Sequence, residues 1–406
     1  MNNWKVILSI VGLGAVAALL LVWFVFSQTA TPPTATTNTG FGESGTKTTT
    51  TATQEQTTNT AQPVQNTNSV GQKITKIAEG PIAGAVLLQT GHPTTTVARY
   101  VLQSNGHVME VALDSPGAIP KALSNTTVPG IAQAFWSERG AGVLVQYLDG
   151  TTVKTAHISL PTPGSTTTPL ARIQFLPNSI SSLAVAPDGS NIAYVVKTQS
   201  GADIFIAKPN GGGQKLTSLP LSQIALGWPA PGTLLVQSAA ASGVAGIALA
   251  IDTKSGASSP ILFGAGLTAI ADRAFAHVVY QTSGDSRTTY SYTIKTGIAL
   301  PLVLTPMPEQ CAFGNASSTV LYCGAPYDSS APPNYPDLWR MGTASYSDAL
   351  LSYNLTTGAR QALAVPGSTD GGQQADFASL TLSPDDHYAA YVRKGDRSLW
   401  TIRLTN

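Results

Sequence analysis

The residues of this chain that could do chemistry are few and widely spaced. No GxSxG nucleophile turn, HExxH or CxxC metal motif, Walker loop or DxDxDG calcium loop occurs in the 406 residues. Charged residues form only 11% of the chain, the net charge is +1, and no basic cluster exceeds two neighbours, as at Arg393-Lys394. A surface that tracks nucleic-acid phosphates is therefore not expected. These side chains predict no catalytic group, no cofactor and no metal site.

The two cysteines offer one defined reaction, which is oxidation to a disulfide. Cys311 and Cys323 begin and end the segment CAFGNASSTVLYC, which reads as two strands around a corner at Gly314-Asn315. Antiparallel pairing through that corner places the two residues opposite each other. Because such a pair tends to oxidise outside the cytoplasm, and because two cysteines alone make a poor zinc site, we expect a disulfide.

A segment rich in aromatic residues follows the second cysteine. Residues 324–347, GAPYDSSAPPNYPDLWRMGTASYS, form the longest excursion between two predicted strands. Tyr, Trp and Arg dominate the energetics of interfaces, and long ordered loops often carry recognition. The same aromatics could instead fold back over the domain, and both roles stay open. The candidate partner-contact residues are Tyr327, Tyr335, Trp339, Arg340 and Tyr346.

The elements that would position these residues are short strands separated by turns. Residues 183–219, LAVAPDGSNIAYVVKTQSGADIFIAKPNGGGQKLTSL, hold four apolar runs, with the first turn at Pro187-Asp188-Gly189. Proline cannot donate to a ladder, aspartate bonds nearby backbone N–H groups, and glycine accepts a positive φ. The stretch therefore predicts a four-stranded antiparallel meander. It returns near the C-terminus, where Pro384-Asp385 occupies the same turn.

Corners like this one recur along the chain and can be counted. They lie about 42–50 residues apart, except for a last interval of about 70 that contains the segment 324–347. Seven corners predict an all-β, seven-bladed β-propeller, with six or eight blades as alternatives. The corners between the first and second strands are Gly91-His92, Ser137-Glu138, Pro187-Asp188, Pro229-Ala230, Asp272-Arg273, Gly314-Asn315 and Pro384-Asp385.

The two ends of the repeat array predict how the ring closes. The last blade shows only three strands before Asn406, whereas the segment 73–78, KITKIA, has no partner in the first blade. Pairing KITKIA with the last strand would remove an exposed edge and close the ring. The five histidines, His92, His107, His157, His277 and His387, are assigned to five different blades, so a shared metal site is not expected.

The best-preserved repeats resemble those of TolB-type propellers, which are relatives of WD repeats. The pattern SPDG-x-x-IAY…IY…GG…LT is matched by residues 187–217, and more loosely by 383–391, with Asp386 in the glycine position. The resemblance covers about 330 residues and implies the propeller fold. For function it implies only a binding platform, because such propellers serve many unrelated systems.

The first 72 residues predict export and anchoring. Residues 6–26 carry no charge, are long enough to cross a bilayer as a helix, and follow Lys5 in the short segment 1–5. We expect an uncleaved, N-in transmembrane anchor, with a cleaved signal peptide as the alternative. Residues 27–72 are rich in threonine and read as a disordered linker, either a bare spacer or an O-glycosylated stalk. Residues 73–406 would form the propeller.

Together these features favour a membrane-anchored, extracytoplasmic binding or scaffold module of the cell envelope. Its partner would be an envelope protein or a glycan. Two alternatives remain at this point: an enzyme of lyase or cyclotransferase type with its site on a propeller face, and a structural coat protein. Three or more converging His, Asp or Glu side chains on the axis would favour the enzyme.

Overall fold

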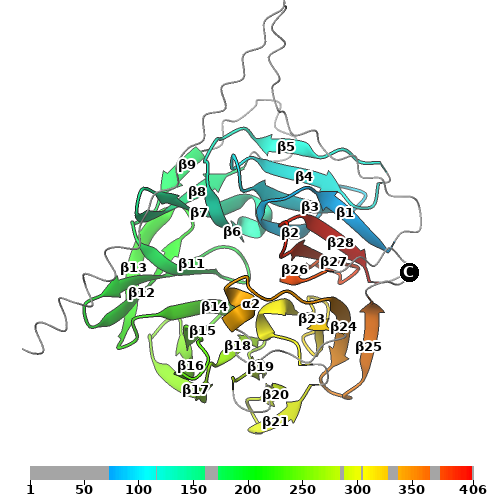
Figure 1. Cartoon of the computed structure of the whole chain (residues 1–406). Helices are drawn as coiled ribbons and strands as arrows, with labels where there is room; N and C mark the ends of the chain where they lie inside the picture. The colour runs from blue at the N-terminus through cyan, green and yellow to red at the C-terminus, as the bar shows by residue number, and fades with distance from the viewer. Residues whose placement is uncertain are drawn as a thin grey trace, which may run out of the picture. The chain divides into compact units, whose positions relative to one another are not determined.

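The computed structural model describes residues 73–115, 117–160, 172–283, 288–302, 305–327, 337–365 and 375–404. In these ranges the strands form seven antiparallel sheets of four strands each, arranged as a ring (Figure 1). The fold is a seven-bladed β-propeller, as the spacing of the corners predicts.

The predicted anchor (6–26) and linker (27–72) lie outside the described residues. Within those residues, no helix is both long and apolar enough to cross a membrane.

Each blade is a meander of consecutive strands, numbered here in chain order. Blade 1 is β2 (Ile82–Thr90), β3 (Thr95–Leu102), β4 (Val108–Ala112) and β5 (Lys121–Ser124). Blade 2 is β6 (Ile131–Ser137), β7 (Gly142–Asp149), β8 (Thr152–Ser159) and β9 (Arg172–Phe175). Blade 3 is β10 (Ile180–Val185), β11 (Ile192–Thr198), β12 (Gly201–Lys208) and β13 (Gly211–Leu219). Blade 4 is β14 (Ile224–Ala230), β15 (Thr233–Ser238), β16 (Ala245–Asp252) and β17 (Ser258–Ala265).

The remaining blades follow the same order, with short helices beside them. Blade 5 is β18 (Thr268–Ala271), β19 (His277–Gln281), β20 (Thr289–Thr293) and β21 (Ile298–Pro301). Blade 6 is β22 (Cys311–Phe313), β23 (Val320–Pro326), β24 (Asp348–Asn354) and β25 (Arg360–Ala364). Blade 7 combines β26 (Phe377–Leu382), β27 (Tyr388–Arg393) and β28 (Leu399–Arg403) with β1 (Ile74–Ala78). The helical turns are η1 (Glu138–Gly140), η2 (Pro308–Gln310) and α2 (Asp337–Arg340).

The ring closes through β1, as the unpaired KITKIA segment predicts. β1 pairs antiparallel with β28, with Ile74 opposite Ile402. Joining the first strand of the domain to the last covers an edge that would otherwise expose unpaired backbone groups. The last blade is therefore completed by residues about 325 positions earlier in the sequence.

The hydrophobic core is divided among the seven interfaces between neighbouring blades. Each interface has its own cluster of buried apolar side chains; for example, Ile204 and Leu234 join blades 3 and 4, and Ile77 and Leu87 join blades 7 and 1. The other five clusters fill the interfaces between the remaining neighbouring blades in the same way. Alternating apolar residues on both faces of each sheet build these contacts, so the ring is held together all the way around.

Candidate functional site

The first strand of every blade is the innermost, and the corners that follow these strands gather around one mouth of the channel. The innermost strands of blades 1 to 7 are β2, β6, β10, β14, β18, β22 and β26. Neighbouring members of this set contact one another from β22 through β26 and β2 around to β18. Because successive strands run antiparallel, the corner between strands one and two lies on the same face in each blade. The mouth on this face is called the corner mouth below.

The corner mouth holds a cavity of about 510 Å³. Blades 1, 2, 3, 5, 6 and 7 contribute to its lining. A second hollow of about 290 Å³ shares Pro187, Arg273 and Asn315 with it and adds Trp228 and Pro229 from blade 4. All seven blades therefore contribute to the walls of this mouth, and the larger cavity has the size typical of small-molecule sites.

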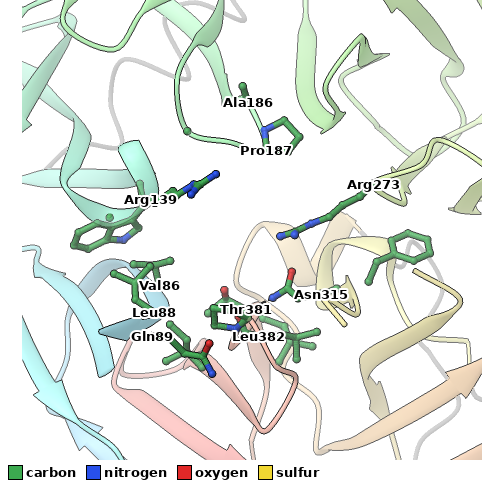
Figure 2. Close-up of a pocket in the computed structure, with 18 residues that line it drawn as sticks. Val86, Leu88, Gln89, Arg139, Ala186, Pro187, Arg273, Asn315, Thr381 and Leu382 are labelled. Carbon is green, nitrogen blue, oxygen red and sulfur yellow. Dashed lines mark hydrogen bonds between the residues drawn. The ribbon is translucent and has the colours of Figure 1, made fainter. Parts of the chain in front are cut away.

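Two arginines extend into this cavity from different sides of the ring. Figure 2 shows the side chains of Arg139, from blade 2, and Arg273, from blade 5, directed toward its open centre. Both residues are exposed, and neither guanidinium has a hydrogen bond or an ion pair with the described part of the chain. The walls are partly apolar, with Val86, Leu88 and Leu382 among the lining residues.

The backbone that carries Arg139 is held from blade 1. Arg139 lies in η1 with φ 53°, in the left-handed region that few non-glycine residues adopt. The carbonyl oxygen of the next residue, Gly140, accepts a hydrogen bond of 2.7 Å from Arg99 Nη1. Arg99 is itself buried and paired with Glu110 at 2.7 Å. This buried chain of contacts fixes the corner from which Arg139 projects.

Hydrogen bonds between neighbouring blades hold other parts of the rim. Gln89 Nε2 donates to Asp385 Oδ2 at 2.6 Å, which links blades 1 and 7. Asn315 Nδ2 donates to the carbonyl oxygen of Ser383 at 2.9 Å, and Asn315 N donates to Asp386 Oδ1 at 2.8 Å. These bonds link blades 6 and 7, so the mouth is assembled before any ligand arrives.

The predicted turn residues lie in the corners at this mouth. Asp188 Oδ1 accepts a hydrogen bond from Ser190 N at 3.0 Å, and Gly189 has a φ of +74°. Hydrogen bonds from Ser190 lower the pKa of Asp188, and the charge of Arg139 adds to this effect. Asp385 Oδ1 accepts from His387 N at 3.1 Å, so the carboxylates at Pro187-Asp188 and Pro384-Asp385 both bond their own turns.

The excursion rich in aromatic residues lies on the opposite face. β23 continues to Pro326, so the break between strands is residues 327–347, three residues shorter than the sequence indicates. The segment 337–347 is called the cap below. Asp337 Oδ2 accepts from Ser242 N at 2.9 Å, and Arg340 Nη1 donates to the carbonyl oxygen of Ala240 at 3.1 Å. Both partners belong to blade 4, and α2 lies close to the ring centre in Figure 1.

The cap is also attached to blade 7 through Trp339. The exposed fraction of this residue is 7%, and its Nε1 donates to Asp376 Oδ1 at 2.6 Å. Lys394 Nζ lies 4.3 Å from the centre of the Trp339 ring and donates to the Ala344 carbonyl oxygen at 2.9 Å. Desolvation lowers the pKa of Lys394. Trp339 therefore contributes to packing within the molecule, which favours the covering role over direct partner contact.

The other candidate partner-contact residues have different surroundings. Arg340 forms an ion pair of 2.8 Å with Glu309. Tyr346 packs against Trp339 and Met307, whereas Tyr327 is 47% exposed. Tyr335 lies outside the described residues. Partner contact through this group stays a prediction.

The cysteines are joined as the sequence predicts. Cys311 and Cys323 lie opposite each other in the β22–β23 pair and form a disulfide. Both residues are buried in the interface between blades 5 and 6. The bond therefore braces blade 6 close to Asn315 and the corner mouth.

The histidines are distributed differently from the prediction. His92 and His107 both belong to blade 1, because β3 and β4 flank His107, so four blades rather than five carry a histidine. His277 Nδ1 lies 3.3 Å from Asp272 Oδ2, and His387 Nδ1 lies 3.1 Å from Asp385 Oδ2. Among the described residues no three His, Cys, Asp or Glu side chains gather as a metal site would require.

Comparisons with known proteins identify the fold and no family. No family model and no curated protein matches the chain. A solved oligogalacturonate lyase in complex with manganese is 11% identical, with a TM-score of 0.50 over 81% of this chain and 99% of that chain. A chain of the mitotic checkpoint complex is 14% identical, with a TM-score of 0.52 over 84% of this chain and 97% of that chain. At these identities the similarity concerns the propeller fold alone, and the finer resemblance to TolB-type repeats stays a prediction.

The two arginines of the corner mouth are the residues that sequence reasoning missed. The sequence already places Arg273 in a predicted corner and Arg139 directly after one. The first-to-second-strand corners of a propeller meet on one face, so an inventory of charged residues in those corners finds both side chains.

Proposed function

We propose that this chain is a non-enzymatic binding module of the cell envelope that takes its ligand or partner at the corner mouth. The observation that carries the proposal is the cavity of about 510 Å³ into which Arg139 and Arg273 project, neither of them with a partner among the described residues. Binding sites are typically concave, partly apolar and supplied with a few convergent polar groups. The corner mouth has these properties.

The rigidity of the mouth supports a binding role. Gln89, Arg99 and Asn315 fix its corners through hydrogen bonds that run between blades. A site that is already ordered loses little conformational entropy when a ligand binds, which favours affinity. On the opposite face, the cap packs against blades 4 and 7. We therefore assign recognition to the corner mouth.

The proposed location is the outer side of the membrane, with residues 6–26 as the anchor and 27–72 as the spacer. The charge asymmetry around residues 6–26 supports this orientation. The disulfide between Cys311 and Cys323 supports it too, because disulfides persist in oxidising compartments. Protease added to intact cells whose outer envelope has been permeabilised should release a fragment that starts in the linker. A soluble form that begins near Thr29 without added protease contradicts the anchor.

Filling the corner mouth without changing its charge tests the proposed site. Thr381 is half-buried and lines the cavity from β26, so Thr381→Trp would occupy part of it. A matched variant, Ser259→Trp, adds the same side chain to an exposed position on the outer strand β17. Both variants are compared with the wild type by proximity labelling and pull-down of the anchored protein from its own membrane.

The expected result is a specific envelope component that the wild type and Ser259→Trp capture and Thr381→Trp does not. Equal melting temperatures of the three proteins show that the loss is not an unfolding effect. Capture that Thr381→Trp leaves unchanged contradicts the corner mouth as the site.

A further inference from the structure

We propose that the corner mouth binds a small ligand through an oxyanion, a carboxylate or a phosphate, held between Arg139 and Arg273. The inference rests on the proposed function, because it names the ligand chemistry of the same cavity. It starts from the place of these two arginines among those of the propeller. Arg99, Arg340 and Arg393 are each paired with a carboxylate. Arg172 and Arg360 lack an ion pair with the described residues but lie exposed on the outer strands β9 and β25. Arg139 and Arg273 lack a described partner and line the cavity.

The carboxylates around the mouth do not neutralise this pair. Each carboxylate that the structure describes in the first-to-second-strand corners already accepts hydrogen bonds from its own or a neighbouring corner. These pairs are Asp188 with Ser190, Asp272 with Ala276 and His277, Asp385 with Ser383 and His387, and Asp386 with Asn315 and Ala316. The charge of Arg139 contributes to the lowered pKa of Asp188, after the hydrogen bonds from Ser190, but no ion pair joins these two side chains.

The shape of the guanidinium group determines which anion fits. Arginine presents a planar fork of N–H donors that matches the two oxygens of a carboxylate or a phosphate. Two such forks on different blades, projecting into one cavity, suit a ligand with one or two acidic groups. The adjoining apolar walls at Val86, Leu88 and Leu382 would contact its carbon skeleton.

The volume argues for a small ligand. About 510 Å³ lies within the range of small-molecule pockets and is too small for a folded partner to enter. The ligand class is therefore a small organic acid, an acidic sugar or a phosphorylated metabolite, either free or carried as an exposed group by the envelope component that the mouth captures. Their shared chemistry is the oxyanion.

Two probes test the inference on the full-length protein in detergent. Citrate supplies carboxylates and pyrophosphate supplies phosphates, and each is titrated calorimetrically at low ionic strength up to about 10 mM, which covers the millimolar affinities expected for simple anions. The variants are Arg139→Gln and Arg273→Gln. The matched control is Arg360→Gln, which makes the same charge change at an exposed position on the outer strand β25.

At least one probe should bind the wild type, and affinity should fall as sodium chloride is added. Because a charge-assisted hydrogen bond contributes roughly twice as much as a neutral one, each mouth variant should weaken binding by about tenfold or more. Arg360→Gln should change it by less than about twofold, because its charge is far from the mouth. Comparing citrate with pyrophosphate shows which oxyanion the mouth prefers.

Two results overturn the inference. One is the absence of binding of both probes to the wild type, and the other is binding that neither Arg139→Gln nor Arg273→Gln weakens. If Thr381→Trp abolishes partner capture while both arginine variants retain it, the proposed site stands and its anionic chemistry is wrong. Melting curves of each variant separate these results from loss of the fold.

Discussion

The carboxyl group of Asp348 predicts an unusual dependence of stability on pH. Asp348 begins β24 and is 3% exposed. Its Oδ2 accepts hydrogen bonds from Gln310 Nε2 at 2.8 Å and from Phe377 N at 2.9 Å. Its Oδ1 and the Oε1 of Gln310 are both buried, and neither has a hydrogen-bond donor among the described residues. A proton on Asp348 would supply the missing donor.

The pKa of Asp348 agrees with this geometry. The pKa is raised to about 8, chiefly by burial and also by the nearby charge of Asp376, while the hydrogen bonds from Phe377 and Gln310 and the charge of Lys394 oppose the rise. The ordinary value is 3.8, so the folded protein binds a proton that the unfolded chain has released between about pH 4 and pH 8. Stability therefore falls as the pH rises through this window. At 1.36 kcal/mol per pKa unit, the loss over the whole window is roughly 6 kcal/mol.

The variant Asp348→Asn isolates this effect. Its amide oxygen would accept the same two hydrogen bonds, and its amide N–H group could donate toward Gln310 Oε1 without any ionisation. We expect the variant and the wild type to have similar free energies of unfolding near pH 5. Near pH 9 the variant should be more stable by several kcal/mol, because only the wild type must bury a charge.

Urea denaturation at a series of pH values between about 5 and 9 measures both curves. Asp149→Asn, at an exposed position, is the matched control and should keep the slope of the wild type. Parallel curves for Asp348→Asn and the wild type would refute the reasoning, because they would mean that Asp348 has the same charge in the folded and unfolded states.

Three further predictions concern the integrity of the ring. Replacing Cys311 and Cys323 together by serine should lower the free energy of unfolding by about 3 kcal/mol. Reductant should have the same effect on the wild type and no effect on the double variant. An unchanged free energy of unfolding would show that the bond does not restrict the unfolded chain. Deleting the residues of β1 (Ile74–Ala78) should lower the free energy of unfolding by about 4 kcal/mol or more, because the buried isoleucines Ile74 and Ile77 leave the closing blade. If a chain without β1 is as stable as a chain that begins at residue 73, closure through β1 is contradicted. Trp339→Phe should lower the free energy of unfolding, measured by urea denaturation, by about 1.5–3 kcal/mol, because it removes the hydrogen bond to Asp376. An unchanged free energy of unfolding would mean that the cap is loosely held.

Local turn chemistry explains why the blade count could be predicted. The seven corners between first and second strands lie at or within two residues of the positions that the sequence indicates, because proline, aspartate and glycine specify turns through nearby backbone bonds. The closing strand was also predictable, since KITKIA had no partner in its own blade. Pairing of Cys311 with Cys323 followed from the register of a single hairpin.

The features that were not predicted depend on contacts across the ring. Arg139 and Arg273 are each an exposed residue near a turn, and they meet only because the ring brings blades 2 and 5 to one mouth. The burial of Trp339 depends on Asp376 and Lys394, which belong to the next blade. No local pattern in the sequence encodes such pairings.

The corner mouth as an anion site is tested most directly by an experimental structure of the protein with citrate or pyrophosphate bound. The predicted result is a single anion in the cavity, with the guanidinium groups of Arg139 and Arg273 within hydrogen-bond distance of its oxygens. An anion bound elsewhere on the propeller, with this cavity empty, would contradict the account.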